Sequence, residues 1–382
     1  MKKRIAAVLI VLFLSAFLLG NATINDEKTL DEIVAGELEN IDLEALEELY
    51  ELTFTDEKSY SETLNDLLKG KFGEDNESFF GYVKNVIFNN LNSYLPIFAG
   101  IVAIVILCSV MQDFKSSGLS EGIGEVISLV GFSAVLILLV PTLTDFFTKT
   151  ENTIEFIAKT GEIMSPIMAT LMVAAGENVS AAMYKPSLLF LTNGIIGVYL
   201  KIILPLSGLI AVFSVIAAIS PRFRFTKFTE FFGSTVKWIA GLIFTVFGVF
   251  MTVRGITAAS YDGVSFKTAK YLVSNSVPIA GGFLRDGFDL FMAGSVLIKN
   301  AVGVAGLFMI FYRVISPVVE MAVFSLLLKA TAAVTESFSF SSVSTLLTSL
   351  SKSISYFIMC LLTVGFMFFV VILLIILSAG AF

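Results

Sequence analysis

Residues 281–303 read GGFLRDGFDLFMAGSVLIKNAVG. The predicted fold depends on why this stretch carries charges beside a short apolar run. The apolar run at residues 290–298 is too short to cross a bilayer, because a spanning helix needs roughly 20 apolar residues. Charged residues flank the run on both sides: Arg285, Asp286, Asp289 and Lys299. The stretch nevertheless lies inside a strongly hydrophobic chain, so the charges must be explained from the sequence as a whole.

The composition is that of a membrane protein. Of the 382 residues, 56% are hydrophobic, only 15% are charged and 37 are Phe, and the mean hydropathy is +0.88. These values lie outside the range of ordinary globular proteins. We therefore predict an all-α, polytopic membrane protein with about six to eight transmembrane helices.

The N-terminus carries the three parts of a secretory signal peptide, at residues 1–22. The basic residues Lys2, Lys3 and Arg4 precede an apolar run, and a small-residue cleavage site ends at Ala22. An uncleaved anchor of the same orientation is the alternative. In both cases, we expect the residues that follow to be exported.

Residues 23–80 form a strongly acidic segment. Residues 23–78 hold 18 acidic and four basic side chains, whereas the whole chain has a net charge of −7, so the remainder is net positive. Leu46, Leu49 and Leu52 recur at helical spacing, which predicts short amphipathic helices outside the cytoplasm. A solvated acidic surface is the ordinary interpretation, and a docking surface for a basic partner is the alternative.

Apolar runs long enough to span a bilayer recur through the rest of the chain and group into pairs. Between the pairs lie two stretches that are apolar but interrupted by Gly, Pro or charged residues. The sequence therefore predicts helix pairs at residues 94–147, 203–258 and 314–378, separated by interrupted inserts at residues 148–202 and 259–313.

The two inserts and the helices that follow them resemble each other. When the two inserts are aligned with a gap of five residues, Asn193 is matched with Asn300. These matches favour an internal repeat; the alternative is chance similarity between segments of restricted composition. Three further residue pairs are each separated by 112 positions: Pro166 and Pro278, Lys201 and Arg313, and Pro205 and Pro317.

A topology follows if the acidic segment is outside. Each helix pair then enters and returns, which places the connections at residues 113–125, 221–237 and 335–353 in the cytoplasm. The basic residues of the middle connection fit the positive-inside tendency. Each insert must then cross an even number of times. We interpret the inserts as re-entrant helical hairpins, because broken helices are tolerated at membrane depth where protein or a wet cavity shields them.

Charges within the apolar zones are the candidate functional positions, because an ionisable residue at membrane depth is costly and is usually paired or faces a cavity. Three roles remain open for them: an ion-pair cluster that pins a turn, the lining of a polar conduit, or proton or cation coupling. The candidate charge cluster comprises Arg285, Asp286, Asp289, Lys299 and Asn300. The candidate helix break beside it comprises Pro278, Gly281 and Gly282.

The sequence argues against catalysis. It contains no His, which removes the commonest general base and metal ligand. No phosphate-binding loop and no basic patch interleaved with aromatic residues is present. We therefore predict no enzymatic activity, no catalytic residue, no cofactor, no metal site and no binding of nucleic acid.

A specific set of residues invites comparison with a known family. The runs DGVSFKTAKY (residues 262–271) and LIKNAVG (residues 297–303) enclose Asn275, Pro278, Gly281, Gly282, Asp286 and Asp289. Together they resemble the signature region of the stage III sporulation protein AE family. The order of signal peptide, acidic exported segment and multi-spanning body is also similar, so the resemblance extends over nearly the whole chain.

The resemblance implies a non-enzymatic component of the sporulation-specific, secretion-like channel complex that links mother cell and forespore and supports late forespore gene expression. Such a protein would lie in the mother-cell-derived outer forespore membrane, with the acidic segment in the intermembrane space. The implied partners are small membrane subunits, a cytoplasmic ATPase and ring-forming subunits of the same operon, and indirectly a forespore-side channel protein. A homo-oligomer is compatible with this role.

Two alternatives stay open: an independent secondary transporter that uses Asp286 and Asp289, and a purely structural membrane anchor of the complex.

Overall fold

The computed structural model describes residues 44–51, 53, 59–68, 79–113, 121–219, 225–276, 281–338 and 340–378. Within these ranges, the side chains of residues 79–80, 112–113, 121–123, 125 and 254–290 are not described. Every regular element of the described residues is helical, which confirms the predicted all-α class. The predicted signal peptide lies outside the described residues.

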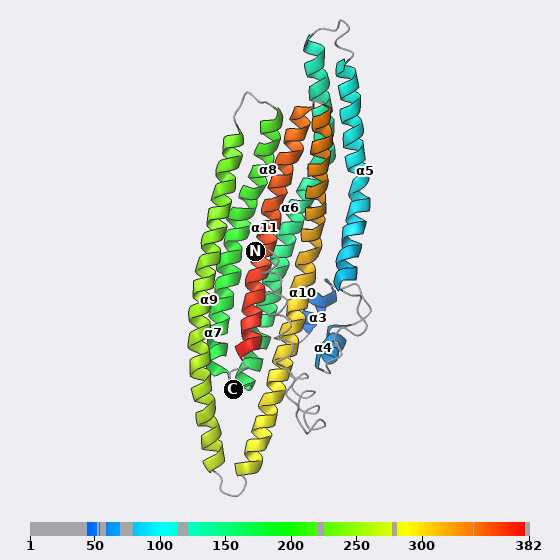
Figure 1. Cartoon of the computed structure of the whole chain (residues 1–382). Coiled ribbons are helices and arrows are strands. Elements are labelled where there is room, and N and C mark those ends of the chain that lie inside the picture. Colours follow the sequence, from blue (N-terminus) through cyan, green and yellow to red (C-terminus); the bar gives the residue numbers. More distant parts are fainter. Residues whose placement is uncertain are drawn as a thin grey trace.

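Long helices run side by side and form an elongated bundle (Figure 1). Between α7 and α8 the chain stays helical but widens into two π-helical segments. The elements of the bundle are α5 (Phe79–Asp113), α6 (Glu121–Ala174), α7 (Asn178–Leu189), η2 (Phe190–Ile196), η3 (Tyr199–Ile203), α8 (Leu204–Ile219), α9 (Thr226–Ser276), α10 (Gly281–Ser337) and α11 (Ser341–Ser378).

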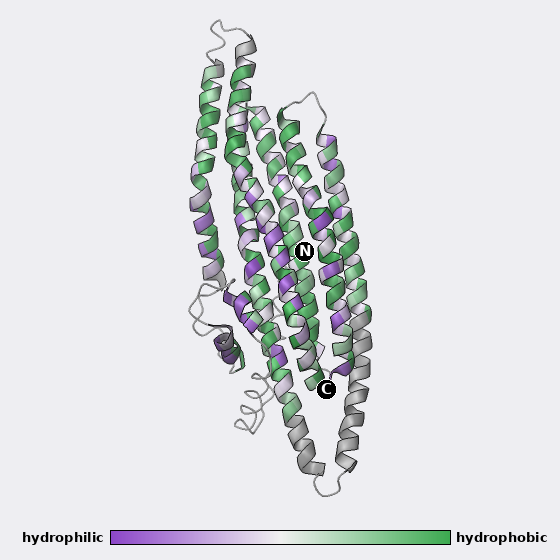
Figure 2. Ribbon diagram, turned by 180° about the vertical axis from the view of Figure 1, so that it is seen from behind, coloured by the Kyte–Doolittle hydropathy of each residue, from purple (hydrophilic) through white to green (hydrophobic). Residues whose placement is uncertain are grey.

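Six helical segments of the described chain are long and apolar enough to cross a membrane, counting α7 to α8 as one. Each of the six predicted apolar runs lies in a different one of these segments. Figure 2 shows hydrophobic residues along the helices, with hydrophilic residues part-way along several of them. The chain is therefore a multi-pass membrane protein.

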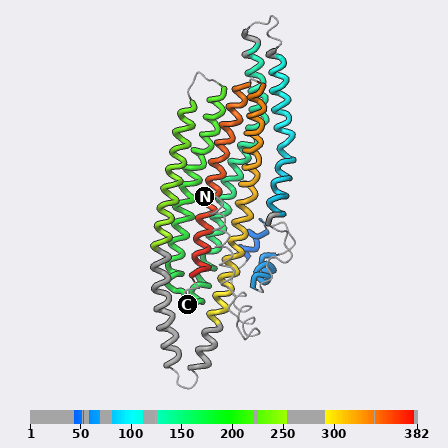
Figure 3. The backbone as a smooth tube through the Cα atoms, viewed as in Figure 1, coloured from blue at the N-terminus to red at the C-terminus, as the bar shows by residue number. Residues whose placement is uncertain are grey.

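Consecutive long helices alternate in direction, so the helix ends gather at the two ends of the bundle (Figure 1). The end of α5, the start of α6, the end of α8 and the start of α9 lie at one end, together with the end of α10 and the start of α11. At this end α5 and α6 extend past α8 and α9 (Figure 3). This arrangement matches the predicted grouping of the three connections on one side.

The helices do not end at the predicted insert boundaries. α6 continues past residue 148, α9 past residue 259 and α10 past residue 313. The physical reason is that charged residues interrupt hydrophobicity without interrupting the backbone hydrogen bonds that define a helix. Each insert consists of two helical arms, which join at residues 175–177 in the first and between Ser276 and Gly281 in the second. Whether these arms re-enter a bilayer stays a prediction, as does the repeat.

Two of the helices are much longer than a bilayer is thick. At 1.5 Å per residue, the 54 residues of α6 and the 57 residues of α10 span about 80 to 85 Å. The hydrocarbon core of a bilayer is only about 30 Å thick. These helices therefore extend well beyond the membrane.

The core is centred on α11, which packs against α10, α8, α6 and α9. Its buried side chains run along its whole length, from Val343 to Ile375. Close contact depends on glycine: a Cβ atom added at Gly161 of α6 would overlap the ring of Phe368 of α11. Small residues allow this kind of close approach between membrane helices.

The acidic segment contributes two short helices, α3 (Glu44–Glu51) and α4 (Tyr60–Leu68). They contact each other, α3 contacts α6 and α4 contacts α10. Leu46 and Leu49 are fully buried, as the amphipathic spacing predicted. Burial raises the pKa of the Tyr60 phenol above its ordinary value, and the nearby Glu47 carboxylate raises it further. The phenol therefore stays neutral at physiological pH.

Candidate functional site

Lys299 is fully buried in α10 and forms an ion pair. Its Nζ atom donates a hydrogen bond of 2.7 Å to Oε1 of Glu177. It also donates one of 3.1 Å to Oγ of Ser378. Lys299 is therefore a charge that is paired inside the protein.

Glu177 occupies the turn between α6 and α7, and its residue surface is only 1% exposed. Gly176 adopts a φ of 81° there, in the left-handed region that glycine enters without steric cost. The backbone N–H of Glu177 bonds to Met172 O at 2.8 Å, and that of Gly176 to Val173 O at 2.9 Å. This pattern is a Schellman motif that ends α6 and directs the Glu177 side chain into the protein.

Ser378, the last residue of α11, completes the network. Its hydroxyl donates a hydrogen bond of 2.6 Å to the second carboxylate oxygen of Glu177. The carboxylate therefore receives a hydrogen bond from α10 on one oxygen and from α11 on the other. A buried charge pair requires such additional hydrogen bonds to offset its desolvation. We call Glu177, Lys299 and Ser378 the buried ion-pair network.

A second charged group lies between α5, α6 and α10. Lys149 of α6 bonds to Glu320 of α10 at 2.8 Å, and to Asp145 one turn earlier at 2.8 Å. The Tyr94 hydroxyl of α5 donates a hydrogen bond to the same Glu320 carboxylate. Only 12% of the Glu320 side-chain surface is exposed. This group joins three helices, whereas the buried ion-pair network joins two helices and the α6–α7 turn.

The structure places the predicted site residues in different parts of the fold. Arg285, Asp286 and Asp289 lie on α10, but their side chains are outside the description. Asp289 and Lys299 are ten residues apart on one helix, about 15 Å along its axis. Lys299 therefore pairs with Glu177 at a level of the bundle different from that of Asp289. Whether the carboxylates join a separate cluster stays a prediction.

Asn300 is partly buried, and its Oδ1 atom has no hydrogen-bond partner in the described part of the chain. Arg313 lies over the ring of Phe156, with 5.1 Å between its guanidinium carbon and the ring centroid. Pro278 is outside the description, while Gly281 and Gly282 begin α10. The other repeat-related residues all lie within helices: Pro166 in α6, Asn193 in η2, Lys201 in η3, Pro205 in α8 and Pro317 in α10.

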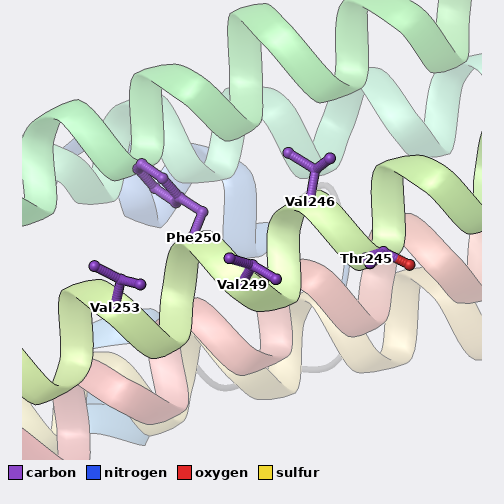
Figure 4. Close-up of a pocket in the computed structure, with 5 residues that line it drawn as sticks. All are labelled: Thr245, Val246, Val249, Phe250 and Val253. Carbon is purple, nitrogen blue, oxygen red and sulfur yellow. The ribbon is translucent and has the colours of Figure 1, made fainter.

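The outer face of α9 carries a shallow apolar depression of about 410 Å³ (Figure 4). It is lined by Thr245, Val246, Val249, Phe250 and Val253. A single helix supplies this lining, which contains no charged group. Val249 and Val253 are about three-fifths exposed. Such a surface is typical of a helix facing lipid.

Glu177 is the functional residue that sequence reasoning missed. The available signal was its isolation, because it is the only acidic residue between Glu162 and Glu230. A lone acidic residue in so long an apolar region indicates a buried partner. The identity of that partner could not be predicted from the sequence, because Lys299 lies 122 positions away.

These features define the class of protein: a multi-pass helical membrane protein whose core encloses an ion pair joining α10, α11 and the α6–α7 turn. The sequence profile described as Stage III sporulation protein AE matches residues 58–380, so the chain belongs to that family. The Stage III sporulation protein AE of Bacillus subtilis (strain 168) is 25% identical over 280 residues, which cover 73% of this chain and 70% of that protein. No solved structure matches the chain.

Proposed function

We propose that this protein is a non-enzymatic membrane component of the sporulation-specific, secretion-like channel complex between mother cell and forespore. In this role it lies in the outer forespore membrane, with α3 and α4 in the intermembrane space. Its partners are the small membrane subunits, the ATPase and the ring-forming subunits of the same operon. The complex supports forespore development and late gene expression.

The observation that carries the proposal is the buried ion-pair network. Lys299 lies in the run LIKNAVG of the family signature, and its partners are a turn and a helix end far away in the chain. An enclosed pair of this kind holds a defined arrangement of helices, whereas catalysis requires access for a substrate. The arrangement therefore favours a platform in a larger assembly over an enzyme.

A test compares Glu177→Gln and Lys299→Met in sporulating cells, each as the sole copy of the protein. Two quantities are measured: co-purification of the operon-encoded partners, and a late forespore promoter reporter. If assembly persists and reporter activity is lost, the network serves a conduit. If both are lost while the variant is present in the membrane at the normal level, the protein serves as an anchor.

Lys227→Met is the matched control, because Lys227 forms an exposed pair with Glu230 at 3.0 Å. We expect normal assembly and expression for this variant. Normal sporulation of both network variants would contradict the proposed role of the network.

The independent transporter remains the competing function, and it depends on Asp286 and Asp289. Purified protein in liposomes would then move solute without any partner, and Asp286→Asn or Asp289→Asn would abolish that uptake. We expect no uptake by the protein alone. Uptake that is sensitive to these substitutions would replace the channel-component proposal.

A further inference from the structure

One face of the α7–α8 helical segment carries exposed polar residues, with Leu189 between them 50% exposed. Lys185, Asn193 and Lys201 are all exposed on it. A Cβ atom added at Gly197 would meet no other atom within 4 Å. We call these four residues the lysine face. Polar and small residues on one side of a membrane helix are typical of a surface where another helix packs.

The π-helical segments explain why these residues share a face. Asn193, Gly197 and Lys201 are spaced by four residues within η2 and η3 and the short link between them. An α-helix has about 3.6 residues per turn, and π turns are wider. Where the two alternate, a spacing of four stays in line along the helix.

The neighbouring helix α6 carries the opposite charge. Glu155 and Glu162 are exposed and Glu151 is partly exposed, and we call these three residues the acidic face. Lys159 on the same stretch interacts with Glu48 of α3 at 3.9 Å. Among the described residues, no ion pair within the chain joins the acidic face to the lysine face. Within one copy, the two faces therefore do not pair with each other.

The charges of the two faces lie at matching levels of the bundle. A Cβ atom at Gly161 would lie 3.6 Å from Leu188 Cδ2, which places these two residues at one level. α6 and α7 run in opposite directions. Glu162 and Lys185 are therefore within about 5 Å of each other in level. Measured from the level of Gly161 and Leu188, Glu151 lies about 15 Å away and Lys201 about 20 Å away, in the same direction.

From this complementarity we propose that a second copy of this chain packs on these faces. A two-fold axis parallel to the bundle preserves the levels, so α6 of one copy meets the lysine face of its partner. Glu151 then opposes Lys201, and Glu162 opposes Lys185, at two equivalent places. A contact of this kind is self-complementary and closes as a dimer. It does not depend on the channel role, since it requires only the chain in a membrane.

Cross-linking between differently tagged copies in membranes tests the contact. One copy carries Glu151→Cys and the other Lys201→Cys, so only a contact between copies gives a product with both tags. We expect such a product with a short bifunctional maleimide. The control replaces Lys201→Cys by Val249→Cys on α9, which is 61% exposed and belongs to neither face; we expect no product.

Charge reversal tests the pairing itself. Lys185→Glu with Lys201→Glu in every copy should reduce co-purification of the two tagged copies by roughly tenfold, because like charges then oppose each other. Co-expression with a copy carrying Glu151→Lys and Glu162→Lys should restore it. Three results would each overturn the proposal. The Val249→Cys control could cross-link equally well, or the Glu151→Cys and Lys201→Cys copies could give no product. The third is that the two charge-reversed copies fail to co-purify.

Discussion

At the scale of single residues, the enclosed charges depend on their partners. Glu177 and Lys299 are almost completely buried, and a charge left alone in such a place cannot recover its lost hydration. The hydroxyl of Ser378 binds both members of the pair, so it fixes their geometry as well as their charge balance. The network therefore behaves as one unit, and removing one member affects the others.

This coupling predicts the stability of variants. Lys299→Met leaves the Glu177 carboxylate buried without its cation and should destabilise the protein by about 3–5 kcal/mol. The double variant Lys299→Met with Glu177→Leu should recover most of that loss, because two apolar side chains replace the pair. The measurement is the apparent Tm of the detergent-solubilised protein. A double variant that is less stable than Lys299→Met would show that the charges are not coupled.

At the scale of elements, helix continuity and close packing shape the bundle. Some charged residues of the inserts are paired, as Lys149 is with Glu320, and others are exposed on the helix surface. Neither arrangement interrupts the backbone hydrogen bonds of the helix. The α6–α11 contact depends on Gly161, where the ring of Phe368 occupies the space of a side chain. Phe368 is itself fully buried, so its ring cannot turn out into solvent.

The packing predicts a strong effect of a single methyl group. Gly161→Ala should destabilise the protein by about 1–3 kcal/mol through overpacking, despite the better helix propensity of alanine. Gly241→Ala on α9 is the control, since its Cβ atom would meet nothing within 4 Å, and we expect no loss. Thermal unfolding in detergent measures both. Recovery by Gly161→Ala with Phe368→Leu would confirm the cause.

At the scale of the whole molecule, six alternating segments place both ends of the membrane body on one side. The start of α5 and the end of α11 lie at the end of the bundle opposite to the start of α9 (Figure 1). The helices of the acidic segment contact the long helices: α3 contacts α6, and α4 contacts α10. An exported N-terminal segment then requires an exported C-terminus as well.

Cysteine accessibility in intact cells tests this arrangement. Ser61→Cys and Asn178→Cys should react with an impermeant maleimide added outside. Thr226→Cys and Ser337→Cys should react only after the membrane is permeabilised. All four positions are exposed, so a position that is not labelled lies on the other side of the membrane from the reagent. Labelling of Thr226→Cys from outside would contradict the topology.

Much of the fold could be predicted from local sequence patterns, whereas the site could be predicted only in part. The apolar runs indicated six spanning segments, and the leucine spacing indicated the buried side of α3. Lys299 stood out as a charge in an apolar region, but Glu177 did not, and the helices continue across the predicted insert boundaries. Hydropathy changes at residues 148, 259 and 313 without ending a helix, because a helix is defined by backbone bonds.

The sequence by itself determined that this protein enters a membrane and that it is helical. Both follow from local physics, since a long apolar run favours lipid over water and must satisfy its own backbone hydrogen bonds there. Only the tertiary structure decided which charges meet. Whether Lys299 reaches Glu177, and whether Lys201 stays uncovered, depends on how distant helices pack. That packing is the sum of many weak contacts between residues far apart in the chain.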